Sequence, residues 1–237
     1  MAAETLRLPL AAAVFASGSG SNFLALQAAE PRGAPWRIRL LISDREEAGA
    51  LERARSLGIE TRVVPVSGRS PEEVGRETVE LLEQSGIQVI FLAGYLRLVP
   101  RAVTEAYRRR ILNVHPALLP AFGGKGMYGR RVHEAVIAAG ERFSGPTVHF
   151  VDEHYDEGTI LAQWRVPVLS DDTPDSLAAR VLEVEHRLYP LAAARLCRAL
   201  ASGVEPSPLA PAVAENAATA PDLPNIETLF QEAFPGP

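Results

Sequence analysis

The sequence predicts an α/β protein with a doubly wound, mostly parallel sheet, late antiparallel strands and a long C-terminal helix. Three observations carry this prediction. Apolar runs alternate with helical segments through the first half of the chain. The run VIFLAG at 89–94 is continuously apolar, as in strands covered on both faces. Two strand-like runs then flank a polar turn, and a helical pattern covers 175–203.

Proline, glycine and serine residues mark the ends of the helices expected in the first half of the chain. Pro31 stops the first helix, Gly58 is placed to cap the C-terminus of the second, and Ser70 and Pro71 open the third as N-cap and first helical residue. The expected strands cover 10–17, 37–43, 60–66, 89–94 and 111–114, and the expected helices cover 22–30, 48–58, 70–86 and 100–108.

The second half changes character. Strands are expected at 147–153 and 159–169, and the helix at 175–203 has a candidate bend at Pro190. We place one folded domain at 1–203 and a Pro/Ala-rich, mostly irregular tail at 204–237. The tail contains a short apolar segment, IETLF, suited to docking or association. Because the tail lacks core periodicity, we expect the domain to fold without it.

Composition excludes several classes of protein. The chain has 237 residues, 47% hydrophobic and 22% charged, which is enough for a substantial core. A net charge of -5 argues against a nucleic-acid partner. The single cysteine, Cys197, excludes an intrachain disulfide and a cysteine-rich metal site, and its helical setting favours a buried filler role. The N-terminal apolar run suits a first strand better than a signal peptide, and no run could span a membrane, so we expect a cytoplasmic protein.

The first motif with chemical potential is ASGSGSNFLAL, which follows the first strand. Gly18 and Gly20 allow backbone N–H groups to converge on an anion, and Ser21 and Asn22 add side-chain donors at a helix N-terminus. A dinucleotide site would use Asp44 after the second strand, but the third glycine of that fingerprint is missing. A phosphomonoester fits better, and a tight turn with a capped helix is the structural alternative.

The second motif is LNVHP, at the end of a strand. Asn113 and His115 are two residues apart, so their side chains point to the same side. Histidine moves protons near neutral pH, and an amide can donate to an oxyanion. Pro116 and Pro120 stiffen the loop, and one of these X-Pro bonds is a candidate for the cis form. A purely structural pair is the alternative.

The third motif is the acidic loop DEHYDEG, which holds Asp152, Glu153, His154, Asp156 and Glu157 between two strands. Three interpretations are open. The loop is a solvated turn, a metal site that matches no calcium template, or the source of a carboxylate that stabilises a catalytic imidazolium.

In order and spacing these motifs resemble the phosphoribosylglycinamide formyltransferases, a folate-dependent family of purine synthesis. The resemblance covers 10–203, and further matching pieces are LERAR, AGYLRLV, GGKGMYGRRVHEAV, VPV and EHRLYPL. Related enzymes acting on methionyl-tRNA need a further C-terminal domain, and formyltetrahydrofolate hydrolases add a regulatory domain in front. We expect neither in this chain. The resemblance implies a Rossmann-like formyltransferase fold.

The resemblance also implies two ligand sites. The phosphate of N1-(5-phosphoribosyl)glycinamide would be held by Gly20, Ser21 and Asn22, with Glu185 facing its ribose or glycinamide part. The residues implied for the pterin of 10-formyltetrahydrofolate, mainly through their main chain, are Leu96, Arg97, Leu98 and Val99, with Asn113 and the loop ending at Asp156. Arg69 is the nearest candidate for the folate-contacting arginine of the family, and the contacts of the loop at 121–131 are undefined.

For catalysis the resemblance implies Asn113, His115 and Asp156. The glycinamide amine would attack the formyl carbon, Asn113 and protonated His115 would stabilise the oxyanion, and Asp156 would favour the charged imidazole. No metal is implied. His133 and His149 match histidines of the family, and we expect mainly structural roles for them.

Two other functions remain in competition. One is a formyltransferase acting on another amine, such as an amino-sugar nucleotide. The other is a nucleotide-binding module without catalysis, which would leave the three catalytic candidates unexplained. We expect small-molecule substrates, no nucleic acid, no membrane, and a homodimer as a candidate assembly.

Overall fold

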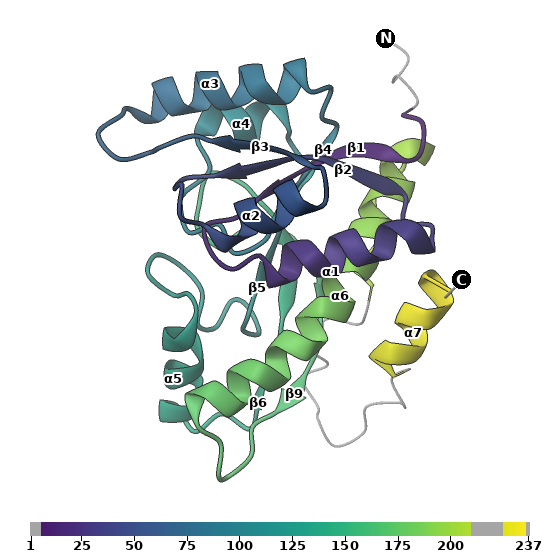
Figure 1. The fold of residues 1–237 in the computed structure, drawn as a ribbon. Helices are drawn as coiled ribbons and strands as arrows, with labels where there is room; N and C mark the ends of the chain where they lie inside the picture. The colour runs from purple at the N-terminus through teal and green to yellow at the C-terminus, as the bar shows by residue number, and fades with distance from the viewer. Residues whose placement is uncertain (1–5, 210–224, 236–237) are drawn as a thin grey trace.

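The computed structural model describes residues 6–209 and 225–235. Its centre is a seven-stranded sheet in the order β3-β2-β1-β4-β5-β7-β8 (Figure 1). A small second sheet pairs β6 with β9. The strands are β1 Leu10–Phe15, β2 Trp36–Ser43, β3 Glu60–Val63, β4 Val89–Leu92, β5 Ile111–His115, β6 Phe143–Ser144, β7 Thr147–Phe150, β8 Ile160–Gln163 and β9 Val166–Pro167.

Helices cover both faces of the sheet. One core cluster joins the sheet to α1, α2, α6 and α7, and a second joins its other face to α3 and α4. A third cluster packs α5 and β9 against α6. The helices are α1 Ser21–Ala29, η1 Glu30–Arg32, α2 Gly49–Ser56, α3 Pro71–Gln84, α4 Arg101–Ala106, α5 Arg130–Ala138, α6 Pro174–Ser202 and α7 Ile226–Ala233. The predicted doubly wound architecture is confirmed.

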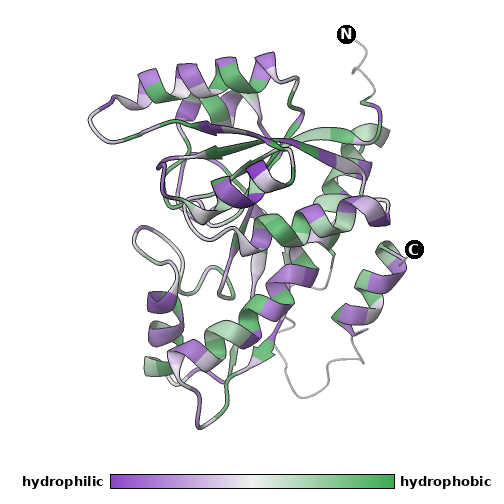
Figure 2. Cartoon of the chain, in the orientation of Figure 1, coloured by the Kyte–Doolittle hydropathy of each residue, from purple (hydrophilic) through white to green (hydrophobic). Residues whose placement is uncertain are grey.

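The local signals in the sequence produce the predicted boundaries. Ser70 accepts a hydrogen bond from the N–H of Glu73, whose side chain accepts from the N–H of Ser70, so α3 starts with a capping box. Gly58 follows α2 with φ 71°, as a left-handed C-terminal residue should. Figure 2 shows the central strands coloured hydrophobic and α3 striped, which is the pattern that the two-sided core requires.

The parallel half of the sheet fixes where a ligand can bind. β1 pairs in parallel with β2 on one side and with β4 on the other, so the direction of winding reverses between β1 and β4. The carboxyl ends of neighbouring strands diverge at such a switch point and leave a crevice. The segments that follow β1 and β4 therefore lie at the mouth of this crevice.

The antiparallel half adds the late strands. β5 pairs with β7, and β7 with β8, both antiparallel. In this register Asn113 lies opposite His149, and His115 lies opposite Thr147. The long helix α6 begins with a capping box at Thr173, contains Pro190 and ends at Gly203. The predicted late strands and long helix are thus confirmed.

The apolar segment of the tail forms helix α7, which packs against the body. Phe234 is fully buried with its ring against Trp36, and Phe230 lies between the guanidinium groups of Arg32 and Arg187, 5.0 and 5.3 Å from its centroid. The apolar segment IETLF thus packs on the body, which is one of the two roles expected for it, and the domain boundary at 203 stays a prediction. Phe234 was not singled out from the sequence, because it lies just beyond the last residue of the helix and adds no periodicity to it. Residues 210–224, also part of the expected tail, lie outside the described residues.

Candidate active site

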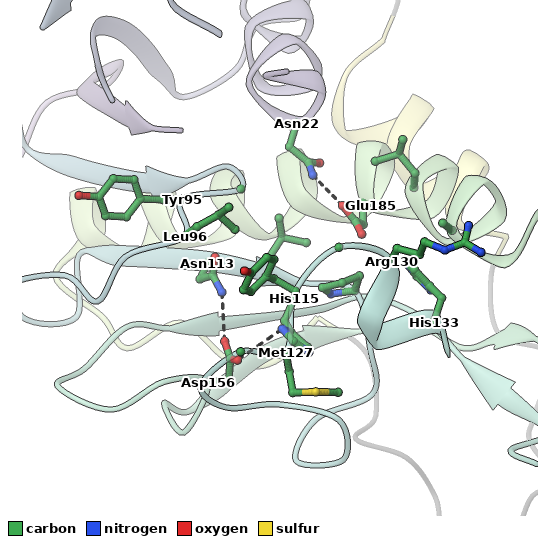
Figure 3. Close-up of a pocket in the computed structure, with 18 of the residues that line it drawn as sticks. Asn22, Tyr95, Leu96, Asn113, His115, Met127, Arg130, His133, Asp156 and Glu185 are labelled. Atoms are coloured by element: carbon green, nitrogen blue, oxygen red, sulfur yellow. Dashed lines mark hydrogen bonds and ion pairs between the residues drawn. The ribbon is translucent and has the colours of Figure 1, made fainter. Parts of the chain in front are cut away.

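A cleft of about 700 Å³ opens at the carboxyl ends of β4 and β5 and reaches across to α6. It gathers residues that lie between Asn22 and Glu185 in the sequence (Figure 3). The lining side chains with polar or aromatic groups are Asn22, Tyr95, Arg97, Asn113, His115, Lys125, Tyr128, Arg130, His133, Tyr155, Asp156, Asp175 and Glu185.

Asn113 lies at the centre of a hydrogen-bonded cluster. Its Nδ2 is 3.0 Å from Nε2 of His149 and 3.4 Å from Oδ1 of Asp156. The other ring nitrogen of His149, Nδ1, is 2.8 Å from the carbonyl of Phe150, which can only accept. Nδ1 therefore carries the proton and Nε2 accepts from Asn113. The structure thus brings His149, expected to be mainly structural, into direct contact with the predicted site.

His115 is buried beside this cluster. Its Nε2 donates to the carbonyl of Phe122 at 2.8 Å, and its Nδ1 lies 3.5 Å from Oδ2 of Asp156. Burial lowers the pKa of His115, while Asp156 and the Phe122 carbonyl act to raise it, and the net direction is downward. A neutral His115 can therefore accept a proton on Nδ1, where the neighbouring carboxylate would stabilise the resulting cation.

Asp156 is held where it can serve both rings. Its backbone has a left-handed φ of 58°, and Oδ2 accepts the N–H of Gly124 at 2.9 Å. Gly158 closes the loop tightly, because an added Cβ would lie 1.8 Å from the carbonyl oxygen of Phe150. Burial alone would raise the pKa of Asp156, but the interactions that His149 and His115 make with it when protonated, together with the Gly124 N–H, outweigh burial and lower the pKa. The carboxylate is therefore ionised at neutral pH.

A buried polar network fixes the loop after His115. The N–H of Leu119 donates to Oγ1 of Thr147 at 3.1 Å, and that hydroxyl donates to the carbonyl of Ala117 at 2.6 Å. Gln163 donates to both the Leu119 carbonyl and the Thr147 hydroxyl. The Leu119–Pro120 bond is cis, as one X-Pro bond of this loop was expected to be. Strands β7 and β8 thus preorganise the loop that carries the site.

The other end of the cleft holds Asn22 and Glu185. Asn22 donates from Nδ2 to Oε2 of Glu185 at 2.6 Å, across 163 residues of sequence. Oδ1 of Asn22 is buried and has no partner among the described residues. Burial raises the pKa of Glu185 to about 7, and the hydrogen bond from Asn22 offsets only part of that effect. Figure 3 shows this pair separate from the contact between Asn113 and Asp156.

The two residues before Asn22 are placed differently. Gly20 is left-handed with φ 82°, and an added Cβ would lie 2.8 Å from that of Ala50, so the turn needs a glycine. Ser21 lines a smaller neighbouring pocket between α1, α6 and α7 rather than the cleft. Of the predicted phosphate-binding residues, the cleft therefore receives the side chain of Asn22.

The predicted folate-binding segment follows β4. Leu96 and Arg97 line the cleft. Val99 is packed in the core and Leu98 is exposed but not among the lining residues, so a ligand in the cleft would meet these two through the main chain at most. Arg69 is paired with Glu77 on α3 at 2.5 Å and does not line the cleft. The contact of Arg69 with the folate stays a prediction, and it would require Arg69 to leave Glu77 or the ligand to extend beyond the cleft.

Sequence reasoning missed several lining residues. The loop at 121–131, whose contacts were undefined, forms one wall of the cleft with Gly124, Lys125 and Met127 among its lining residues. Its run of glycines directly after the HP motif was the available signal. Tyr95 and Tyr155 face the cleft from two other loops, and nothing in the local sequence marked them. Among the described residues, no group of three histidine, cysteine or acidic side chains could hold a metal ion.

The geometry therefore places a histidine, an amide and an ionised carboxylate together at one end of a cleft in a doubly wound fold. Residues 10–193 match the family model described as formyl transferase. The chain belongs to the formyl transferase family. Within this family the cleft is the candidate active site, and its lining residues are the candidate catalytic and binding groups. In the described part of the chain, no helix is both long and apolar enough to cross a bilayer.

Named relatives refine the family assignment. The chain is 48% identical over 187 residues to a chloroplastic phosphoribosylglycinamide formyltransferase of Vigna unguiculata, covering 78% of this chain and 60% of that protein. It is 35% identical to the Escherichia coli K12 phosphoribosylglycinamide formyltransferase, covering 75% of this chain and 82% of that one. The chain thus spans less than two thirds of the plant relative and most of the bacterial relative.

Solved structures agree with this placement. The Brucella melitensis phosphoribosylglycinamide formyltransferase superposes with a TM-score of 0.73 at 43% identity, covering 79% of this chain and 95% of that one. A formyltetrahydrofolate deformylase of Pseudomonas syringae shares the fold with a TM-score of 0.71 at 21% identity, covering 80% of this chain and 61% of that one. The fold is therefore shared beyond the enzymes of one name.

Proposed function

We propose that the protein transfers the formyl group of 10-formyltetrahydrofolate to the amine of N1-(5-phosphoribosyl)glycinamide, a step of de novo purine (IMP) synthesis. The observation that carries the proposal is the contact of Asn113, His115 and Asp156 in one cleft whose other end holds Asn22 and Glu185. The names of the relatives at 35–48% identity support the choice of substrates.

The proposed reaction begins with attack of the glycinamide amine on the formyl carbon. A C–N bond forms, the formyl oxygen becomes an oxyanion, and the bond to N10 of the folate then breaks. Asn113 holds Asp156 through a contact of 3.4 Å, at the upper limit of a hydrogen bond. The oxyanion would replace the carboxylate as the acceptor of this loosely held N–H, because catalytic contacts are often long before substrate binds.

His115 would carry a proton from the attacking amine to the departing nitrogen. The attacking amine loses one proton and N10 gains one. A neutral His115, whose pKa is lowered by burial, can accept the first proton on Nδ1 and return it to the departing nitrogen. Asp156 lies 3.5 Å from Nδ1 and would stabilise the transient imidazolium. His149 would keep the amide of Asn113 in the orientation that presents its N–H groups.

The substrates would occupy opposite ends of the cleft. The ribonucleotide would lie toward Asn22 and Glu185, with its phosphate at the turn formed by Gly20 and Ser21, where the N-terminus of α1 favours an anion. The unpartnered Oδ1 of Asn22 would accept a hydroxyl or amide hydrogen of that substrate. The folate would lie toward Leu96 and the loops around Tyr155, with its pterin against the main chain of residues 96–99.

Absorbance of the deformylated folate tests the proposal. The purified protein is mixed with 10-formyltetrahydrofolate alone, with the glycinamide ribonucleotide, and with an amino-sugar nucleotide. We expect product only with the ribonucleotide. Product with the amino-sugar nucleotide alone would move the enzyme to another amine substrate, and product without any amine would indicate hydrolysis. Turnover in none of the three mixtures would contradict the proposal. A homodimer and a cytoplasmic location stay predictions.

A further inference from the structure

One buried carboxylate plays no part in the proposed chemistry. Asp44 follows the last residue of β2, and its side chain is fully buried. It accepts Nε of Arg97 at 2.8 Å and a guanidinium nitrogen of Arg45 at 3.2 Å. It also accepts the hydroxyl of Ser17. Burial of a charge is costly unless it is paired, and the donors around Asp44 provide this pairing.

Asp44 is connected to the segment expected to bind folate in two ways, through Ser17 and through Arg97. Ser17, which donates to Asp44, also accepts the main-chain N–H of Leu96 at 3.0 Å. Arg97, the next residue, is held directly by Asp44. The ends of three neighbouring strands, β2, β1 and β4, are thereby tied together at the mouth of the cleft. Two consecutive residues of the 94–98 segment are fixed by one carboxylate.

The Asp44 carboxylate is ionised while it holds Ser17 and Arg97. Burial pushes the pKa of Asp44 up, but the hydrogen bonds from Ser17, Arg97 and Arg45 outweigh it, and the pKa lies below the usual range. Arg97 is about half exposed, so it gains a fixed orientation from Asp44 rather than burial. The Tyr95 ring is packed edge-on against Phe15 at 5.4 Å, which anchors the same segment from its other side.

Asp44 does not itself face a ligand. It is absent from the residues that line the cleft, whereas Leu96 and Arg97 are among them. This excludes the ribose-binding role that an acid after the second strand would have in a dinucleotide site. Its oxygens are already used by Ser17, Arg45 and Arg97, so it acts on the cleft through other residues.

We propose that Asp44 is a positioning residue for the folate half of the cleft, fixing the main chain of Leu96 and the guanidinium of Arg97 before folate binds. The proposal rests on the proposed function, because it takes folate as the ligand of this segment. Asp44 would act by preorganisation, so that folate binding orders less of the protein. The ribonucleotide end, built on α1 and α6, would not sense it.

The test replaces Asp44 by asparagine, which keeps the shape and removes the charge. Calorimetric titration measures the dissociation constant of 10-formyltetrahydrofolate, and steady-state kinetics measure kcat and both KM values. We expect the folate dissociation constant to rise about tenfold, equal to about 1.4 kcal/mol. The KM for the ribonucleotide should stay within about twofold and kcat at saturation within about threefold, because binding rather than the transition state is affected.

Two further variants make the test decisive. Ser17→Ala removes the link between Asp44 and the Leu96 N–H but leaves the Asp44 carboxylate and its contact with Arg97, and it should weaken folate binding in the same direction even if Asp44→Asn fails to fold. Arg45→Ala is the matched control, because Arg45 contacts Asp44 but does not line the cleft, and it should bind folate as the wild type does. Unchanged folate affinity in Ser17→Ala and in a folded Asp44→Asn would overturn the inference alone. A wild-type protein that binds no folate would overturn the proposed function and the inference together.

Discussion

The two ends of the cleft each contain a buried carboxylate, and the surroundings drive their pKa values in opposite directions. Asp156 lies among the N–H of Gly124 and the rings of His115 and His149, and its pKa is lowered. Glu185 has the amide of Asn22 as its hydrogen-bond donor, and its pKa is raised to about 7. Carboxyl groups of one site whose pKa values are driven apart commonly have different tasks.

The opposite pKa shifts indicate at which end of the cleft a permanent negative charge is required. Asp156 is kept ionised, as a group must be if it is to stabilise a transient imidazolium. Glu185 is poised between its neutral and charged forms, so it can donate or accept a hydrogen bond when a polar ligand arrives. The proposed catalytic end therefore has a fixed charge, and the end proposed to bind the ribonucleotide can adapt its charge to a ligand.

The largest effect should come from removing the fixed charge. Asp156→Asn keeps the shape and removes the carboxylate that raises the pKa of His115, so the pKa of His115 should fall further. We expect kcat to drop about a hundredfold to ten-thousandfold, the range for a lost proton-transfer or oxyanion-stabilising group. The acidic limb of the pH–rate profile, where His115 becomes protonated and can no longer accept the proton, should move to lower pH. Steady-state kinetics between pH 5 and 9 measure both.

A charge in the same loop provides the control. The side chain of Asp152 is about half exposed and accepts the N–H of His154, and among the described residues it makes no hydrogen bond or ion pair with the cluster around Asp156. Asp152→Asn should therefore turn over like the wild type. Wild-type kcat in Asp156→Asn across the pH range would show that the acidic loop is a solvated turn. The conclusion that the reaction needs a fixed charge at this end of the cleft would then be wrong.

The next effect concerns how the stability of the protein depends on the ionisation of Glu185. A carboxyl group whose pKa rises on folding contributes stability that is present below its unfolded pKa of 4.5 and is lost as pH rises through about 7. Glu185→Gln removes that dependence. From pH 5 to 8 the unfolding free energy of the variant should improve by about 2 to 3 kcal/mol relative to the wild type, because most of the difference between the two pKa values takes effect within this range. Urea denaturation at both pH values measures this. A constant difference between the two proteins would mean that Glu185 is solvated.

The smallest effect separates Asn22 from Ser21. Asn22 lines the cleft and has an unpartnered oxygen, whereas the side chain of Ser21 lines the neighbouring pocket. Asn22→Ala should raise the KM for the ribonucleotide about tenfold, the cost of one hydrogen bond to a charged or polar ligand, and Ser21→Ala about twofold. The KM for the folate should stay unchanged in both. An equal rise for both substrates would remove the assignment of this end to the ribonucleotide.

Much of the fold and one end of the site followed from local sequence signals. Asn113 and His115 share a side because they are two apart on one strand, and the caps of α2 and α3 are local in sequence. The bond between Asn22 and Glu185 joins residues 163 apart, so no local pattern encodes it. The sequence alone suggested both residues only through the family resemblance.

The supporting residues were harder to predict. Thr147 and Gln163 lie on apolar-looking strands, and only the pairing of β7 with β8 turns them toward the loop after His115. Asp44 was considered as a ligand-binding acid because of its place after β2. Two of its partners, Ser17 and Arg97, follow two other strands, and only the folded sheet brings them into contact with Asp44.

Helix α7 packs against residues near the start of the sequence, so this part of the core can form only after α7 has been synthesised. Arg32 bonds to the carbonyl of Phe234, 202 residues later, and Trp36 at the start of β2 packs on the ring of Phe234. On a ribosome the early sheet therefore emerges before the residues that cover it beside α1, because α7 follows far later in the sequence. Contacts this distant in sequence form late. The packing around Trp36 is thus completed only once residues 226–234 have been made.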